Sequence, residues 1–260
     1  MMAGLLAVAE WFMQAPHGVR FDWGRAGAER LASRSACLVI VDVLSFTTSV
    51  TVAVEAGIRV FPYAWRDESA AVFAAERQAV LATGRRATST DSPWSLSPAA
   101  LRNAPFTARL VLPSPNGSAI AAAAAAGGSV VVASCLRNAA ATGSWLADQG
   151  FGTEQRPVTV IAAGERWPDG SLRPALEDLL GAGAILAALQ GEDAGRVLSA
   201  EAAAAGVCFE GTRDVVAAVC ACASGRELTE GGFGEDVAIA AEVNACGVVP
   251  VLTDGAFSAA

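Results

Sequence analysis

The sequence predicts an α/β fold with helices layered on both faces of a mainly parallel sheet, α/β/α, that leaves room for some antiparallel pairing. Three observations favour this class. Short runs rich in β-branched residues recur along the 260 residues, a turn and an alanine-rich stretch follow each run, and the runs are apolar almost throughout. Alternating strands and helices are typical of βαβ units. Nearly continuous apolar strands indicate burial on both faces of the sheet.

Six apolar runs are the expected strands, and the first of them, CLVIVD, ends in an aspartate. They lie at residues 37–42, 58–63, 109–114, 129–134, 158–163 and 247–252. Helical candidates, most of them rich in alanine, occupy residues 45–56, 67–82, 117–126, 137–148, 177–190, 195–205, 213–223 and 235–244. We expect one folded unit over residues 1–260, with residues 150–160 as an alternative point of subdivision.

Two stretches break the strand–helix alternation. Residues 84–107 are polar, contain proline and lack periodicity, which predicts a long loop, and loops of that length usually carry function. The glycine-rich, acidic residues 229–237 lead into the last expected helix. The apolar residues 1–9 lack the basic region of a signal peptide and stop at Glu10, so we expect a packed terminal segment.

Composition restricts the class of protein and its partners. Hydrophobic residues make up 53% of the chain and charged residues 17%, which is typical of a globular protein. The net charge of −8, with no lysine at all, disfavours nucleic acid as a partner. No window is apolar for long enough to span a membrane. Six cysteines without CxxC spacing favour free thiols in a reducing cytoplasm.

Ligands of parallel α/β sheets bind beyond the carboxyl ends of the strands. The polar residues at those positions are therefore the candidate site. They are Asp42, Ser45, Thr47, Thr48, Ser114, Asn116, Gly117, Ser134, Arg137, Asn138, Gly164, Glu165 and Arg166. Structural alternatives remain open for several of them: a helix cap at Asp42 or Ser45, a turn at Asn116 and Gly117, and a solvated side chain at Arg137.

Adjacent acids at Glu177 and Asp178 stand twelve residues after Glu165. Together these carboxylates could hold a hard cation such as Mg²⁺. The alternative is that Glu177 and Asp178 only complement the dipole of a helix that begins near Pro174. Because His17 is the single histidine, a zinc site rich in histidine is excluded. Leu44 stands where a haloacid dehalogenase-type phosphatase has its second acid, which disfavours that class.

Several motifs in order, VDVLSFTTSVTVAVEAG, LPSPNGSAIA, ASCLRNAAAT, VIAAGE, LEDLLGAGAIL, SGRELTEGGFGEDVAIAAEVN and VVPVL, cover residues 37 to 255. In these motifs the chain resembles the 2-phosphosulfolactate phosphatase (ComB-like) family. The resemblance implies a ComB-like α/β fold and Mg²⁺-dependent hydrolysis of the phosphate ester of a small sulfonated hydroxy acid. The product would be sulfolactate, on the way to coenzyme M. Where this family commonly has an arginine after VDVL, the chain has Ser45 and Phe46.

Our first hypothesis is a cytoplasmic, Mg²⁺-dependent phosphatase for a small anionic phosphorylated substrate. Its metal ligands come from Asp42, Glu165, Glu177, Asp178 and Asp236. Asp42 is also catalytic, and Arg137 and Arg166 stabilise the phosphoryl charge. Substrate contacts come from Ser45, Thr47, Thr48, Asn116, Gly117, Ser134 and Asn138, with further positive charge available from Arg85 or Arg86. The alternatives are a non-catalytic protein that binds small anions on the same scaffold and a catalyst for another acid. Assembly of the chain into a homo-oligomer is a further open alternative.

Overall fold

The computed structural model describes residues 10–64, 67–193 and 195–260. Within this part of the chain, one mixed sheet of nine strands runs in the order β1-β7-β2-β6-β10-β11-β3-β5-β4. Its strands are β1 (Val19–Trp23), β2 (Cys37–Val41), β3 (Arg59–Tyr63), β4 (Val80–Leu81), β5 (Arg109–Pro113), β6 (Val130–Ser134), β7 (Val158–Ala162), β10 (Pro250–Thr253) and β11 (Ala256–Ala259). A separate hairpin joins β8 (Glu165–Arg166) to β9 (Leu172–Arg173).

Two parallel sets of strands make up most of the sheet. The first set is β1, β7, β2 and β6, and the second is β3, β5 and β4. The C-terminal hairpin of β10 and β11 lies between the two sets and pairs antiparallel with β6 on one side and β3 on the other. The α/β class with a mainly parallel, mixed sheet is therefore confirmed.

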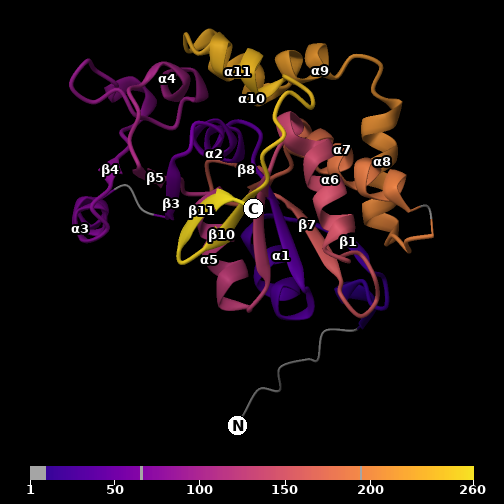
Figure 1. The fold of residues 1–260 in the computed structure, drawn as a ribbon. Helices are drawn as coiled ribbons and strands as arrows, with labels where there is room; N and C mark the ends of the chain where they lie inside the picture. The colour runs from indigo at the N-terminus through magenta and orange to yellow at the C-terminus, as the bar shows by residue number, and fades with distance from the viewer. Residues whose placement is uncertain (1–9, 65–66, 194) are drawn as a thin grey trace.

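Helices cover both faces of this sheet (Figure 1). The helices are α1 (Gly24–Leu31), α2 (Phe46–Glu55), α3 (Glu68–Glu76), α4 (Pro98–Asn103), α5 (Gly117–Ala126), α6 (Ala139–Asp148), α7 (Leu176–Glu192), α8 (Ala200–Gly211), α9 (Val215–Ala221), α10 (Ala223–Glu230) and α11 (Gly234–Ala240). Alternate side chains of β2 point to opposite faces, as strand geometry requires. Val39 and Val41 pack with α6 and α7, whereas Leu38 and Ile40 pack with α2 and α5.

The register of β2 sets the position of the candidate site. Val41, the last residue of β2, pairs with Ser134 of β6 and with Ala162 of β7. The loops that follow these three strands therefore leave the sheet side by side. Above them in Figure 1, α9, α10 and α11 lie across the top of the molecule.

The N-terminal and C-terminal parts of the sheet depart from the sequence prediction. Strand β1 and helix α1 were not expected, because Arg20 and Asp22 interrupt the apolar pattern of what is an edge strand. Strand β11 was also missed, although Asp254 and Gly255 both have positive φ in the turn before it. Asp-Gly between two strands is a strong hairpin signal, so the sequence did carry this information.

Other boundaries also differ from the prediction. The helix expected at 67–82 ends at Glu76, and β4 follows it. The loop expected at 84–107 contains α4, which begins after Ser97 as its cap and with Pro98 in its first turn. The helix expected at 213–223 is two helices, α9 and α10, which meet at Cys222. In contrast, α5 has the predicted bounds.

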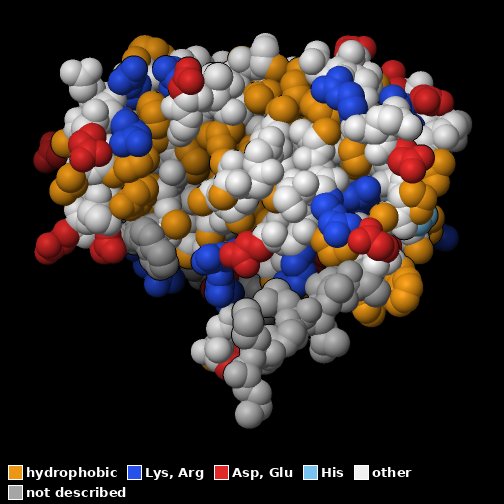
Figure 2. Space-filling view, turned by 90° about the horizontal axis from the view of Figure 1, so that it is seen from below, with side chains coloured by type: hydrophobic (Ala, Val, Ile, Leu, Met, Phe, Trp, Pro, Cys, Tyr) orange, Lys and Arg blue, Asp and Glu red, His pale blue; other side chains and the backbone are white. Residues whose placement is uncertain are grey.

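Several sequence-based expectations concern the surface and the thiols. All six cysteines are free, as their spacing predicted. No helix in the described ranges has both the length and the hydropathy to cross a bilayer. Seen from below in Figure 2, basic and acidic side chains are interspersed over this face. The packed segment expected at 1–9 lies outside the described residues, and the single folded unit stays a prediction.

Candidate active site

Asp42 follows β2 directly and is buried, with 8% of its surface exposed. Its Oδ1 accepts a 3.0 Å hydrogen bond from the amide of Phe46, in the first turn of α2. The hydroxyl of Thr47 donates to the carbonyl of Asp42 and accepts from its amide, which fixes the backbone at this point. Burial raises the pKa of Asp42 to about 6, although the Phe46 amide and the charge of Arg85 act to lower it.

Gly117 brings the start of α5 against the start of α2. A Cβ at this position would lie 2.1 Å from Cδ1 of Phe46, so only glycine allows the approach. The amide of Gly117 also donates to the carboxylate of Asp42. The Asn-Gly pair that the sequence offered as a plain turn is therefore a close contact between two helix starts, next to Asp42.

Asp178, in the first turn of α7, joins two loops of the site. Its Oδ1 accepts from the amide of Val43 at 2.7 Å, and its Oδ2 accepts from the amide of Gly164 at 2.8 Å. Both carboxylate oxygens are thus used to hold the loops that follow β2 and β7. Burial, and then the negative charge of Glu177 followed by that of Asp42, raises the pKa of Asp178 well above its ordinary value.

Glu165 and Glu177 complete a group of acids that we call the acidic cluster: Asp42, Glu165, Glu177 and Asp178. Burial, and then the charges of Asp42 and Glu177, raise the pKa of Glu165 to about 7. Glu177 is 2% exposed. Burial also raises the pKa of the Cys222 thiol to about 12, with Glu177 as the next cause, which places this thiol against the cluster.

The acidic cluster has the chemistry of a site for a hard cation. Burial and neighbouring negative charge raise the pKa values of Asp42, Glu165 and Asp178, and buried negative charge of this kind needs a cation to balance it. Carboxylate oxygens are the ligands that Mg²⁺ prefers. In the described residues, however, no group of three or more histidine, cysteine or acidic side chains converges closely enough to hold a metal ion. The donors fit Mg²⁺ in kind, and binding would have to draw their side chains together.

A cavity of about 320 Å³ opens beside the cluster. Its lining includes Glu165, Asn116 and Arg166, together with Arg25 of α1. The Nδ2 atom of Asn116 donates to Glu165 at 3.4 Å, and its Oδ1 atom accepts from Nε of Arg166 at 3.2 Å. Asn116 therefore orients one acid and one guanidinium at the edge of a space suited to a small anion.

Comparison with known families identifies the family of this chain. Residues 27–255 match the profile of the family described as 2-phosphosulpholactate phosphatase. The chain belongs to this family. Its class is therefore that of the phosphoric monoester hydrolases, as the order of its motifs had suggested. No curated protein matches the chain.

Asp236 of this phosphatase-family chain lies apart from the acidic cluster. Its Oδ2 pairs with Nε of Arg85 at 2.8 Å, and its Oδ1 accepts from the hydroxyl of Ser97 and the amide of Ala99. A second nitrogen of Arg85, Nη2, donates to the hydroxyl of Ser45. The structure thus gives Asp236, expected from the sequence as a metal ligand, the role of anchoring an arginine.

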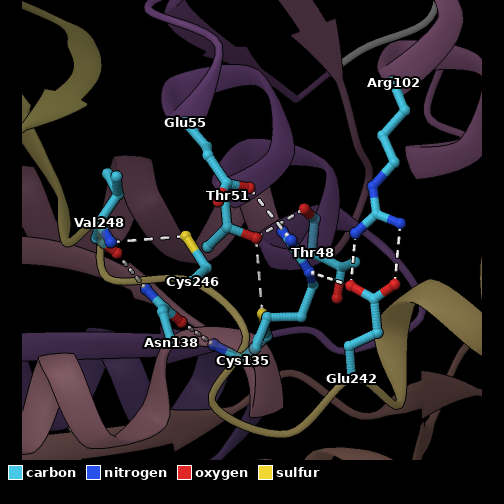
Figure 3. A network of polar contacts seen from close by, with 10 residues as sticks. Thr48, Thr51, Glu55, Arg102, Cys135, Asn138, Glu242, Cys246 and Val248 are labelled. Carbon is cyan, nitrogen blue, oxygen red and sulfur yellow. Dashed lines mark hydrogen bonds and ion pairs between the residues drawn. The ribbon is translucent and has the colours of Figure 1, made fainter.

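Arg137, expected to act on the phosphoryl group of the family's substrate, has other partners, the carboxylates of Glu55 and Glu242, which are labelled in Figure 3. Its Nε donates to Glu242 and its Nη2 to Glu55, both at 3.1 Å. Arg102 pairs with the same Glu242, and this hydrogen bond is the first cause that holds the pKa of Glu242 below its ordinary value. The side chain of Arg137 is 3% exposed, and its Nη1 has no partner in the described residues. Two carboxylates already balance this arginine.

Ser134, Asn138 and Thr48 also have structural partners. The hydroxyl of Ser134 donates to Oδ1 of Asn138 at 3.1 Å, and Nδ2 of Asn138 donates to the carbonyl of Val248 at 3.0 Å. Thr48 donates to the carbonyl of Val43 at 2.8 Å. These side chains brace the loops after β2 and β6, and their role as substrate contacts in the phosphatase stays a prediction.

Sequence reasoning missed two contributors to the site, Ser97 and Cys222. The hydroxyl of Ser97 acts through Asp236, which is far away in the chain, so no local pattern marks this contact. The Ser-Pro pair at 97–98 is a helix-start signal that could have located α4. The sequence indicated only a free thiol at Cys222, and its contact with Glu177 shows that it borders the acidic cluster.

Proposed function

We propose that this protein is a Mg²⁺-dependent phosphatase that hydrolyses the phosphate ester of a small anionic hydroxy acid, with 2-phosphosulfolactate as the first candidate substrate and sulfolactate as the product. The acidic cluster beside an arginine-lined cavity is the observation that carries the proposal. A buried group of acids without a cation opposes folding, whereas the same group is well suited to hold one.

Asp42, Glu165 and Glu177 would hold the ion, because both oxygens of Asp178 already accept backbone amides. When bound, Mg²⁺ would offset the negative charge of the phosphoryl oxygens and favour ionisation of a water molecule. Asp178 keeps the loops after β2 and β7 at a constant separation. Asn116 holds Glu165 and Arg166 at one edge of the cavity.

Arg166 gives the cavity its affinity for anions, because its exposed side chain lines the space and can approach a carboxylate or sulfonate of the substrate. Arg25 lines the same cavity but already pairs with Glu29 at 2.6 Å. A guanidinium binds such groups through two parallel hydrogen bonds. A substrate that carries an acidic group in addition to its phosphate therefore fits this site better than a neutral phosphate ester does.

The direct test is phosphate release by the purified protein. Racemic 2-phosphosulfolactate and a panel of other phosphate esters would be incubated with Mg²⁺ and, separately, with EDTA. We expect release that depends on Mg²⁺ and is fastest for esters with a second acidic group. The Asp42→Asn variant is the control for a contaminating phosphatase. If no ester released phosphate in the presence of Mg²⁺, the proposed activity would be wrong.

A second candidate function is binding of a small anion without turnover. It is favoured by the finding that no three acidic or other metal-binding side chains converge on one point in the described residues. Thermal shift separates the two functions. Stabilisation by sulfolactate or phosphosulfolactate without phosphate release would support binding alone, and stabilisation with release would support the phosphatase.

A further inference from the structure

Arg85 reaches the acidic cluster from a distant part of the chain. It begins a short 3-10 helix, η3 (Arg85–Ala87), in the long loop between β4 and β5. Its guanidinium donates to the hydroxyl of Ser45, forty residues earlier, and to Asp236, 151 residues later. Its side chain is 17% exposed, so most of it is shielded from solvent.

The position of this guanidinium is set by Asp236. The carboxylate of Asp236 is 1% exposed and is itself fixed, because Ser97 and the amide of Ala99 donate to its other oxygen. Asp236 binds Arg85 through Nε, the inner nitrogen of the guanidinium. One outer nitrogen, Nη2, reaches the start of α2, where it donates to the hydroxyl of Ser45.

At the start of α2, Arg85 stands between a weak acceptor and a buried acid. Nη2 is paired with the neutral hydroxyl of Ser45, three residues after Asp42. The positive charge of Arg85 also acts on Asp42. A phosphoryl oxygen is a stronger acceptor for a guanidinium than a hydroxyl is. A phosphate placed beside Asp42 would thus compete successfully with Ser45 for the outer nitrogens.

Arg85 can be reached by a ligand. It lines a cavity of about 340 Å³, together with Arg86, Glu227 and Phe233. Two other arginines predicted for the site have different positions. Glu55 and Glu242 balance Arg137, and Arg166 lines the other cavity together with Glu165. Arg173 acts on Glu165 and donates to the hydroxyl of Ser224. Arg85 acts on Asp42 and donates to Ser45 beside it, so it is placed to meet a phosphate next to Asp42.

We propose that Arg85 binds the phosphoryl group of the substrate through its outer nitrogens, which exchange the hydroxyl of Ser45 for phosphoryl oxygens, and that Asp236 is the positioning residue that aims Arg85. This inference rests on the proposed phosphatase function and specifies which cation meets the transferred group. Arg166, which lines the other cavity with Glu165, is then left for the second acidic group of the substrate.

The experiment combines kinetics with phosphate binding. For Arg85→Gln we expect kcat/KM to fall about 100-fold, the usual loss when one preorganised donor to the reacting group is removed. Arg85→Lys should retain part of the activity, because lysine keeps the charge but not the planar fork. In Arg85→Ala, added guanidinium should restore part of the lost rate. Arg30→Gln, an exposed arginine of α1, is the matched control and should behave as the unmodified protein.

Folding is controlled separately, because removal of Arg85 leaves the buried carboxylate of Asp236 without its ion pair. The double variant Arg85→Gln/Asp236→Asn removes that unpaired charge, and melting curves would report whether each variant is folded. Asp236→Asn alone should weaken inorganic phosphate binding, measured by calorimetry with Mg²⁺ present. In the Arg85→Gln background the same change should have no further effect on phosphate affinity, which a purely structural role of Asp236 would not predict.

The outcomes separate this inference from the proposed function. If the unmodified protein hydrolyses esters and folded Arg85→Gln does so with equal kcat/KM, the role of Arg85 is wrong and the phosphatase function stands. If the unmodified protein releases no phosphate from any ester, the proposed function is wrong. Calorimetry with inorganic phosphate then still tests whether Arg85 binds a phosphate group. Equal affinity for phosphate in the unmodified protein and in Arg85→Gln would then overturn the inference.

Discussion

Asp178 and Val43 are joined by a 2.7 Å hydrogen bond from the amide of Val43 to a buried carboxylate oxygen. The other oxygen of Asp178 accepts from Gly164, so one side chain determines the distance between two loops of the active site. Sequence reasoning offered Asp178 as a metal ligand or as a charge that complements a helix dipole. The structure gives it a third role, as the link between the strand ends that carry Asp42 and Glu165.

The first prediction concerns this link. In Asp178→Asn, the side-chain NH₂ group must face one of the two backbone amides, which leaves a buried donor without an acceptor. We expect a loss of about 1–3 kcal/mol in the free energy of unfolding. Because Asp42 and Glu165 then lose their relative placement, kcat/KM should fall at least about tenfold. Urea unfolding and phosphate-release assays measure the two effects. Unchanged stability would contradict the role of Asp178 as a link.

The second prediction is a dependence of stability on pH and Mg²⁺. The pKa of Glu165 is raised to about 7 and that of Asp42 to about 6, so the folded protein binds more protons than the unfolded chain between about pH 4 and pH 7. These two groups therefore make the protein less stable as pH rises through that window. In EDTA, we expect Tm to fall from about pH 5 to about pH 7.5, and Mg²⁺ should offset much of this fall at the higher pH.

Glu165→Gln provides the control for this dependence, because glutamine does not titrate. The fall in Tm should be smaller in this variant than in the unmodified protein. A fall of equal size would show that other groups cause the pH dependence. Absence of any Mg²⁺ effect on Tm at the higher pH would contradict a cation site at the acidic cluster.

The third prediction concerns the close approach of two helix starts at Gly117. A methyl group there would overlap the ring of Phe46, so Gly117→Ala should lose about 1–3 kcal/mol of stability. Gly206→Ala is the matched control, because its added Cβ meets no atom within 4 Å and alanine is the better helix former. That variant should gain about 0.5–1 kcal/mol. Thermal unfolding measures both, and equal effects of the two changes would refute the contact.

The fourth prediction separates two arginines that the sequence treated alike. Arg137→Gln breaks buried contacts with Glu55 and Glu242, so stability should fall by about 1–3 kcal/mol while kcat/KM of the folded protein is retained. Arg166→Gln should have the opposite result, with stability changed by less than about 0.5 kcal/mol and kcat/KM reduced about 10-fold to 100-fold. A loss of turnover in folded Arg137→Gln would contradict the structural role and support the original prediction that Arg137 is catalytic.

Local pattern was enough for much of the fold and for the acids of the site. The apolar runs of β2, β6 and β7 mark strands buried on both faces, and their predicted bounds agree with the structure to within a residue. Asp42 and Glu165 were found because each follows such a strand, and Glu177 and Asp178 because they begin a helix. These positions follow from chain order and periodicity alone, since parallel strands that are neighbours in the sheet bring their carboxyl ends together.

The partners of the arginines depend on tertiary structure. Arg137 follows β6 as Asp42 follows β2, but α2 extends across the loop after β6 and brings Glu55 to it, and the end of α11 brings Glu242. Arg85 lies in a loop without periodicity, and its contacts with Ser45 and Asp236 span 40 and 151 residues. A long, charged side chain pairs with whichever opposite charge the packed helices present to it. The sequence by itself therefore determined the strands, their alternation with helices and the acids at the strand ends. Only the packing of the helices decided which arginine pairs with which carboxylate.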